Sequence, residues 1–578
     1  MDPIPVIVKH QGKKHEVEVD PSSNGETFKY QLFSITGVEP ERQKIIVKGG
    51  QLKDDTDMSK LGLKPNQTLM MMGTPSGDNN QLLQRPKEKM KFLEDMTEAE
   101  AAAQEGATPA GLQNLGNTCY MNSTLQTLRS IPELQDELLR YSASNAGPSS
   151  TSQLSQFGLG GLGASMDLTG SLRDLFKQMS ETQQGFPPLM FLNALRTAFP
   201  QFAQKGKDGH YAQQDAEEAW SQIVSQLRQK LKIKDTPASE EQKAQDSSFI
   251  DRYMAGRFES VMECDEPAAK EMGEEPVYSE DTFFKLNCHI NVETNHLRDG
   301  LTAGLKEQLE KRSEVLGRDA TYTKTSRIAR LPKYLTVHFM RFDWRRDTSK
   351  KAKIMRKVTF PEELDAVEFC TDQLKSLLIP VRDKIRDVRK EELDVERARK
   401  RQKRMRDGEE NDVEPASSKE PLQKKKEKKE AEEKKSSEDT EMQDIEYKTE
   451  AQIEAERAAS ILAAKKELLA LVDPKLSADE GANQTGLYEL RGVITHQGAS
   501  ADSGHYTSFV KKQGAKDPVT GKRKEEDGKW WWFNDEKVSE VDSERIQTLA
   551  GGGQSHSALI LLYKAVPLST INEEEKKA

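Results

Sequence analysis

Short runs of alternating apolar and polar residues open the chain. Residues 6–10 and 15–19 flank a glycine-containing turn, which predicts two antiparallel strands. A helical period follows and ends at Gly37, and further strands are predicted at 45–47 and 68–72. One face of that helix carries three apolar residues, Phe28, Leu32 and Ile35. Two strands, a helix and further strands in so short a segment predict a β-grasp domain.

A second helical period begins at Cys119, directly after a glycine-rich loop. Met121, Leu125 and Leu128 recur at helical spacing, and Thr118 stands at the expected N-cap position. Unpaired N–H groups and the positive end of the dipole at a helix N-terminus favour a thiolate over a thiol. The pattern therefore presents Cys119 as a candidate nucleophile, although a lone cysteine is more often a small buried apolar residue.

A nucleophilic cysteine needs an oxyanion donor and a base. The side-chain amide of Asn114, five residues before Cys119, would reach an oxygen bound beside the sulfur. Among nine histidines, His505 differs because it begins a β-rich run, and a second run follows at 529–535. Two such runs predict an antiparallel hairpin that brings His505 beside Asn534. An amide there would fix the tautomer and orientation of the imidazole, as a thiol protease requires.

A strongly charged segment interrupts the second half of the chain. Residues 401–440 hold twelve Lys or Arg and twelve Asp or Glu without an aromatic residue, too polar for a core. Amphipathic helical patterns flank the segment, and the second of them stops at Pro474. Their apolar residues are Val381, Ile385 and Val388 before it, and Ile461, Leu462, Leu468, Leu469 and Val472 after it. We expect two helices joined by a disordered or solvated charged tip.

Composition narrows the classes of function. At 578 residues the chain is longer than one ordinary domain, and 31% of its residues are charged. A net charge of −10 argues against nucleic acid as the main partner. The four cysteines form no CxxC pair, which argues against a disulfide framework and an all-cysteine zinc site. We also expect no secretory signal and no membrane-spanning segment.

Three motifs resemble known families. Residues 40–52 are similar to the central strand and turn of ubiquitin, and residues 111–123 resemble the cysteine box of the ubiquitin-specific proteases. Residues 488–506 together with 532–535 resemble the histidine box of the same proteases. The resemblance implies an α+β chain with a ubiquitin-like β-grasp domain and a papain-like catalytic domain of fingers, palm and thumb. It also implies hydrolysis after the C-terminal glycine of ubiquitin.

The resemblance assigns roles position by position. Cys119 would be the nucleophile, His505 the general base and then the acid, and Asn534 the residue that orients His505. Asn114 would donate to the oxyanion together with the backbone N–H of Cys119. Many relatives have aspartate where Asn534 stands, and Asp535 would supply part of the missing charge. The division of labour between Asn534 and Asp535 stays open.

Residues 213–218 resemble the family segment that begins a helix beside the ubiquitin tail. That tail is extended and carries arginines, so carboxylates here would form charge-assisted hydrogen bonds. We expect Asp215, then Glu218, and also Gln214 to bind ubiquitin, whereas composition alone indicates an ordinary solvated helix start. Many relatives hold their fingers with zinc through two CxxC pairs. This chain has only Cys264 and Cys288 there, so we expect no metal and no cofactor.

Nearly the whole chain resembles the branch of the family that carries a ubiquitin-like domain and associates with the proteasome. The likeness implies docking on the regulatory particle of the 26S proteasome, with Ile46 and Met72 as candidate contacts. It further implies trimming of polyubiquitinated proteins, a cytoplasmic and nuclear location, and no membrane partner. We expect a monomer. The alternative is a non-catalytic ubiquitin-binding regulator of the proteasome that uses the same fold.

These patterns divide the chain into four parts. A ubiquitin-like domain is expected at 1–74 and a linker at 75–105. The catalytic domain would span 106–567, interrupted by a charged, partly disordered insertion at about 382–480. Residues 568–578 would form a charged tail.

Overall fold

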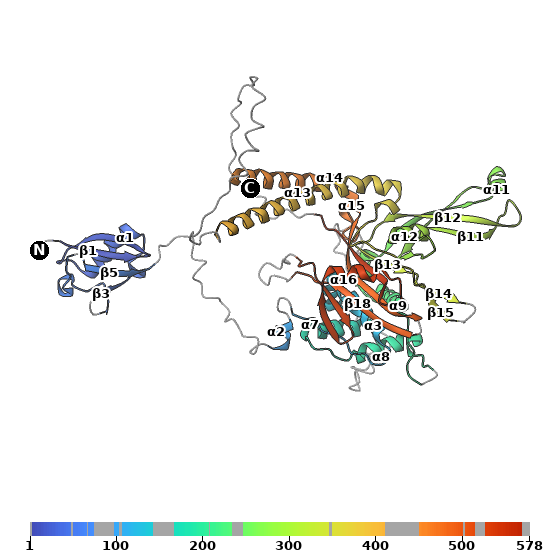
Figure 1. The fold of residues 1–578 in the computed structure, drawn as a ribbon, viewed down its shortest axis with the longest axis horizontal. Helices are drawn as coiled ribbons and strands as arrows, with labels where there is room; N and C mark the ends of the chain where they lie inside the picture. Colours follow the sequence, from blue (N-terminus) through green and yellow to red (C-terminus); the bar gives the residue numbers. More distant parts are fainter. Residues whose placement is uncertain are drawn as a thin grey trace, which may run out of the picture. The chain divides into compact units, whose positions relative to one another are not determined.

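The chain separates into two compact units, residues Met1–Met96 and Thr97–Ala578, which are described here each by itself. Figure 1 shows the computed structural model as a ribbon. The residues that it describes are 3–47, 50–65, 67–73, 97–102, 107–142, 167–206, 209–233, 247–345, 350–410, 450–500, 503–514 and 526–568. The linker expected at 75–105 is therefore described only at its end, where helix α2 (Glu98–Ala102) lies.

The first unit is a β-grasp, as predicted, and it has five strands, of which β4 (Gly50–Gln51) was not predicted. Its elements are β1 (Ile4–His10), β2 (Lys13–Val19), α1 (Gly25–Thr36), β3 (Lys44–Val47), β4 (Gly50–Gln51) and β5 (Gln67–Met72). The strands lie in the order β2-β1-β5-β3-β4, with β1 and β5 parallel. Gly37 ends α1 in the left-handed conformation, with a φ of 70°. Phe28 and Leu32 are buried, whereas Ile35 on the same predicted face is 46% exposed.

The second unit packs a layer of helices against a large sheet. The helices are α3 (Cys119–Arg129), α4 (Pro132–Arg140), α7 (Leu168–Glu181), α8 (Leu189–Ala198), α9 (Ala216–Lys230) and α10 (Phe249–Tyr253). The main path of the sheet is β10 (Leu286–Cys288), β13 (Tyr334–Phe339), β21 (Ser557–Ala565), β17 (Leu487–Ser500), β18 (Ser503–Lys511), β19 (Trp530–Asn534) and β20 (Lys537–Val541). Shorter strands β14 (Phe342–Arg345), β15 (Lys350–Lys353) and β16 (Glu363–Asp365) pair alongside.

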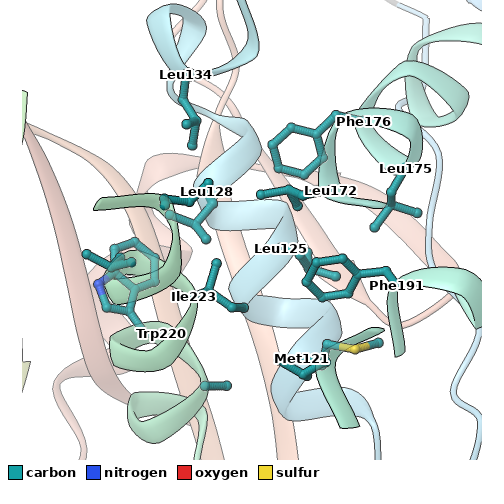
Figure 2. Close-up of a cluster of buried hydrophobic side chains, with 14 of the residues drawn as sticks. Met121, Leu125, Leu128, Leu134, Leu172, Leu175, Phe176, Phe191, Trp220 and Ile223 are labelled. Atoms are coloured by element: carbon teal, nitrogen blue, oxygen red, sulfur yellow. The ribbon is translucent and has the colours of Figure 1, made fainter. Parts of the chain in front are cut away.

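Helix α3 lies at the centre of this unit. Figure 2 shows its apolar residues between Leu172, Leu175, Phe176 and Phe191 on one side and Trp220 and Ile223 on the other. Every residue of α3 from Cys119 to Leu128 is buried, so the helix is enclosed on all sides and not along one face only. Its polar side chains bond to backbone instead of water: Gln126 donates to the carbonyl of Ala110 at 2.9 Å. This enclosure fixes the position of Cys119 at the start of the helix.

A four-stranded sheet extends from the second unit as a finger-like layer (Figure 1). It consists of β11 (Lys306–Arg312), β12 (Asp319–Arg330), β8 (Gly256–Cys264) and β9 (Val277–Phe283), in that order. The outer end is joined by polar side chains: Ser313 donates to the Glu274 carboxylate at 2.7 Å, and Tyr322 donates to the same group. Short helices α11 (Pro267–Glu271) and α12 (Leu297–Gly304) flank the sheet.

The charged insertion begins as two long helices that run side by side in Figure 1. They are α13 (Asp372–Glu410) and α14 (Glu450–Leu471), followed by α15 (Pro474–Ala478). Helix therefore occupies residues 401–410, where a disordered or solvated tip was expected, and the rest of that tip lies outside the described residues. Val381, Ile385 and Leu468 pack against the end of the sheet at Leu487 and Val566. Leu469, another apolar residue of the same helical pattern, is 42% exposed.

Candidate active site

The loop before α3 is shaped by its own side chains. Gly116 and Asn117 have φ values of 89° and 54°, which turn the chain back toward the helix. Thr118 occupies the N-cap position, but its hydroxyl accepts the N–H of Leu115 at 2.9 Å and forms no capping bond to the helix. The predicted N-cap position of Thr118 is therefore confirmed, whereas its side chain does not cap the helix. Its hydroxyl stabilises the loop that presents Cys119.

Three groups surround the sulfur of Cys119, whose side chain is buried. The backbone N–H of Tyr506 lies 3.5 Å from Sγ, and Nε2 of Gln213 lies 3.4 Å from it. The third group is the imidazole of His505. A hydrogen bond to Cys119 raises the pKa of His505 to about 9, against the opposing effect of burial. This pKa favours an imidazolium beside the sulfur at neutral pH.

The predicted hairpin brings His505 and Asn534 together. Strands β18 and β19 are antiparallel, with Ser508 opposite Phe533, so the start of one lies near the end of the other. Oδ1 of Asn534 lies 2.6 Å from Nε2 of His505. Because an amide oxygen only accepts hydrogen bonds, Nε2 carries the proton and Nδ1 is the nitrogen left to face the sulfur.

Asp535 supports the asparagines more directly than it supports the histidine. Its Oδ2 lies 3.9 Å from Nε2 of His505, too far for a hydrogen bond. Its two carboxylate oxygens accept instead from Nδ2 of Asn114 at 3.0 Å and from Nδ2 of Asn122 at 2.8 Å. Oδ1 of Asn114 accepts the backbone N–H groups of Gly116 and Thr118, each at 3.1 Å. Asn114 is therefore fixed at both ends of its amide.

Asn122 is a site residue that the sequence analysis did not single out. It lies one helical turn after Cys119, and its amide also donates to the carbonyl oxygens of Leu112 and Gln113, at 3.1 and 3.3 Å. The i, i+3 spacing from the candidate nucleophile is the only signal that would have indicated it.

One backbone hydrogen bond and one close backbone contact hold the loop before Cys119 against the turn that follows β19. The N–H of Leu112 donates to the carbonyl of Asp535 at 3.1 Å. Gly111 packs so closely on Glu536 that an added Cβ would overlap the Glu536 backbone. Gly111 thus allows the loop of Cys119 and the turn of Asp535 to meet.

A helix begins directly after Asp215, as the resemblance implies for this segment. Asp215 is the N-cap of α9, and its side chain accepts the N–H of Glu217 at 2.9 Å. This residue, predicted first among the ubiquitin contacts, therefore has a structural role. Glu217 pairs with Lys285. Gln214 and Glu218 are half-buried at the start of the helix. The residue of this segment that contacts the Cys119 sulfur is Gln213, for which the sequence predicted no role.

The β-grasp unit carries an exposed apolar patch, here the β3–β5 patch, formed by Ile46, Met70 and Met72. These side chains are 46%, 54% and 51% exposed. Ile46 pairs with Met70 across the two strands, and Met72 lies two residues further on the same face. Ile46 and Met72 therefore share a face, and Met70 is a member that the sequence analysis missed.

Neither finger cysteine lies in a cluster of metal-ligating groups. Cys264 packs with Ala269, Ala320 and Tyr322, and Cys288 lies in another apolar cluster, where burial raises the pKa of its thiol to about 12. Within the described ranges, no three His, Cys, Asp or Glu side chains are grouped so that they could hold a metal ion. None of the described helices is long and apolar enough to cross a membrane.

Two sequence models of known protein families match this chain. The sequence model of the family described as "Ubiquitin carboxyl-terminal hydrolase" matches residues 110–563, and that of the "Ubiquitin family" matches residues 6–76. The chain is 42% identical to ubiquitin carboxyl-terminal hydrolase 6 of Schizosaccharomyces pombe, over 97% of this chain and 99% of that protein.

Two further relatives cover similar shares. Identity is 38% to ubiquitin carboxyl-terminal hydrolase 7 of Arabidopsis thaliana and 30% to ubiquitin carboxyl-terminal hydrolase 14 of Caenorhabditis elegans. Both matches span 97% of this chain, and they span 98% and 94% of the relatives. The family model matches most of the chain, and the full-length relatives are 30–42% identical to it. The chain therefore belongs to the ubiquitin carboxyl-terminal hydrolases, as a thiol-dependent deubiquitinating cysteine protease with a ubiquitin-like domain.

Proposed function

We propose that Cys119 is the nucleophile and that it forms an ion pair with His505. The observation that carries the proposal is the chain of contacts from the Cys119 sulfur through the His505 ring to Asn534, with Nε2 and Oδ1 only 2.6 Å apart. Sγ attacks the carbonyl carbon of the C-terminal glycine of ubiquitin, and the His505 imidazolium gives its proton to the departing amine. A thioester between Cys119 and ubiquitin remains.

Water completes the reaction. Neutral His505 takes a proton from a water molecule, the resulting hydroxide attacks the thioester, and the sulfur leaves as the thiolate. In both steps the negative charge develops on the carbonyl oxygen beside the start of α3. The amide of Asn114, fixed by Asp535 and by two backbone N–H groups, is the donor that meets this oxygen. Asn534 holds the ring of His505 throughout.

The start of α9 is the proposed contact for the ubiquitin tail. Glu218 and Gln214 are half-buried there, within the same segment that places Gln213 on the sulfur. Carboxylates at this position would bind arginines of an extended peptide by charge-assisted hydrogen bonds. Asp215 would contribute mainly by capping the helix that carries the others.

The ubiquitin-like domain is proposed to dock on the 26S proteasome regulatory particle, so that the enzyme trims polyubiquitinated proteins bound there in the cytoplasm and nucleus. The β3–β5 patch supports this part, because three neighbouring exposed apolar side chains on one sheet face are typical of an interaction surface. The resemblance of nearly the whole chain to the proteasome-associated branch of the family supports it as well.

One experiment tests the nucleophile with and without purified proteasomes. The protein is treated with ubiquitin that bears a C-terminal electrophile, and the adduct is measured by mass spectrometry. We expect an adduct on Cys119 that disappears in Cys119→Ala. An adduct that survives in this variant would show that another residue is the nucleophile. Absence of any adduct under both conditions would favour the non-catalytic regulator.

A second experiment tests the docking surface. We expect the double variant Ile46→Ser, Met72→Ser to lose binding to immobilised proteasomes while its rate of adduct formation without proteasomes is unchanged. Tyr30→Ser is the matched control, because Tyr30 is also exposed (57%) but lies on α1, away from the two strands. Equal binding of all three proteins would remove the β3–β5 patch from the proposal.

A further inference from the structure

The side chain of Gln213 is in direct contact with the sulfur of Cys119. Nε2 of Gln213 lies 3.4 Å from Sγ of Cys119, although 94 positions separate the two residues in the chain. The side chain is half-buried, so this hydrogen bond is partly shielded from water. An amide N–H that meets a sulfur beside an imidazolium is placed to stabilise the thiolate form of that sulfur.

The short segment that carries Gln213 is fixed on both sides. On one side, the carbonyl of Tyr211 accepts from Nδ2 of Asn117 at 2.9 Å, which ties the segment to the cysteine loop. The Tyr211 ring also lies under the guanidinium of Arg196, 3.5 Å from the ring centroid. On the other side, Asp215 caps α9. The backbone on either side of Gln213 is therefore held in place, which limits the conformational entropy lost when the Gln213 side chain binds the sulfur.

We infer that Gln213 is a further residue of the catalytic centre, one that donates to the Cys119 thiolate and sets its position for attack. The inference rests on the proposed role of Cys119 as the nucleophile. The N–H of Tyr506 is the second donor and is part of the backbone of β18, whereas Gln213 can be changed by substitution. The charged and titratable groups that act on Cys119 or His505 are Tyr120 of α3, Asp535 after β19, His496 of β17 and His556 before β21, and Arg196 and Glu218 act on Tyr120.

A donor to the thiolate has a particular kinetic signature. It raises the fraction of thiolate at low pH, but it also lowers the intrinsic nucleophilicity of the sulfur. Removal of the donor should therefore slow attack on the acid side of the pH profile and leave the plateau at high pH equal or slightly higher. A residue that only maintains the fold would lower the whole profile by one factor. A residue that only binds the ubiquitin tail would leave reaction with a small reagent unchanged.

The test measures alkylation of Cys119 by iodoacetamide between pH 5 and 10 in the full chain, quantified on the Cys119 peptide by mass spectrometry. In Gln213→Leu we expect the half-maximal rate to move up by about half to one pH unit, which corresponds to about three- to tenfold slower alkylation on the acid side. Gln213→Glu keeps the length of the side chain and replaces the donor by a carboxylate, so its shift should be larger. Gln229→Leu, an exposed position near the other end of α9, is the matched control and should follow the wild-type profile.

The same variants are then assayed with ubiquitin joined to a fluorogenic amide at pH 6.5. We expect kcat to fall about three- to tenfold in Gln213→Leu, with KM within about twofold of the wild type. A rise in KM at constant kcat, or an alkylation profile of Gln213→Glu that matches the wild type, would overturn the inference. Because iodoacetamide needs no ubiquitin, failure of the inference is distinct from failure of the proposed nucleophile, which Cys119→Ala tests separately.

Discussion

Asn534 and Asp535 are neighbours in the chain, yet they support different parts of the catalytic centre. Asn534 bonds to the ring of His505, whereas Asp535 bonds to Asn114 and Asn122 and acts on His505 only through its charge at 3.9 Å. The left-handed backbone of Asp535, with a φ of 52°, follows the strand residue Asn534 and turns the two side chains apart. In the proposed mechanism, one residue thus orients the base, and the next orients the oxyanion donor.

The protonation of His505 gives the first prediction. Its pKa of about 9 depends first on the hydrogen bond to Cys119, while burial acts in the opposite direction. In Cys119→Ala we therefore expect the pKa of His505 to fall well below 9, as measured by NMR titration of the labelled imidazole. In the wild type the raised pKa stabilises the folded state fully below the ordinary histidine value of about 6.5, and this contribution is lost as the pH rises through about 9.

His338 is the control for that titration. Burial lowers its pKa to about 4, and the charged groups that act on it are Glu217, Lys285 and His289 rather than Cys119. Its pKa should not change in Cys119→Ala. A value for His505 that stays near 9 in the variant would show that the sulfur is not its main partner.

The second prediction concerns the charge of Asp535. Asn is tolerated at positive φ and has the same size, so Asp535→Asn should fold. However, one of its two acceptor oxygens becomes an amide that faces the Nδ2 group of Asn114 or Asn122. We expect kcat for ubiquitin hydrolysis to fall about 10²-fold, which is typical for loss of an oxyanion donor, with little change in KM. Asp372→Asn, at an exposed residue of α13, should retain wild-type kcat, and a similar kcat in both variants would contradict this role of Asp535.

The sequence indicated Cys119, His505 and Asn534 because a helix start and one hairpin determine where they lie. It did not indicate Asn122 and Gln213, because their contacts depend on how loops far apart in the chain meet. The periodicity of apolar residues and the residues typical of turns predict local structure only. They do not show which side chains from two distant elements come into contact.

At the scale of elements, contacts with distant segments help to hold a helix that the sequence pattern marks only in part. Helix α13 begins at Asp372 and continues through Pro380, a residue that normally ends a helix. Arg382 and Arg386 both pair with Asp365 at the edge of the sheet, at 3.2 and 2.9 Å, and so hold the segment after the proline. Periodicity in the sequence marks this helix only by Val381, Ile385 and Val388, and it cannot show such ion pairs.

The hairpin of β17 and β18 gives the third prediction. Gly504 directly precedes His505 and has a φ of 143°, and an added Cβ would overlap the Gln497 carbonyl oxygen and lie 2.5 Å from Nε2 of the buried His496. We expect Gly504→Ala to lower the free energy of unfolding of the catalytic unit by about 1–3 kcal/mol, measured by urea denaturation. It should also reduce kcat by about 10²-fold, because a displacement of His505 by about 1 Å is enough for such a loss.

Gly553→Ala is the control for this effect of added volume. An added Cβ at Gly553 would meet no atom within 4 Å, so the free energy of unfolding should change by no more than about 0.5 kcal/mol. Equal stability and equal activity of Gly504→Ala and Gly553→Ala would contradict this prediction. It would show that the hairpin accommodates an added Cβ beside His496 without displacing His505.

At the scale of the whole molecule, the two units have separate apolar cores. The core of the first unit lies between α1 and its sheet and includes Phe28, Leu32 and Ile45. The cores of the second unit lie on the two sides of the large sheet, and Leu125 and Leu490 belong to one each. Each core draws its residues from within one unit, so we expect each unit to fold by itself.

The last prediction follows from these separate cores. Leu32→Ala should destabilise the first unit by about 2–5 kcal/mol, because Leu32 is fully buried. In differential scanning calorimetry the transition of the first unit should then move to lower temperature while that of the second unit stays in place. Leu490→Ala, equally buried in the second unit, should produce the opposite pattern. If either substitution shifted both transitions, the units would unfold together and the ubiquitin-like domain would contribute to the stability of the catalytic one.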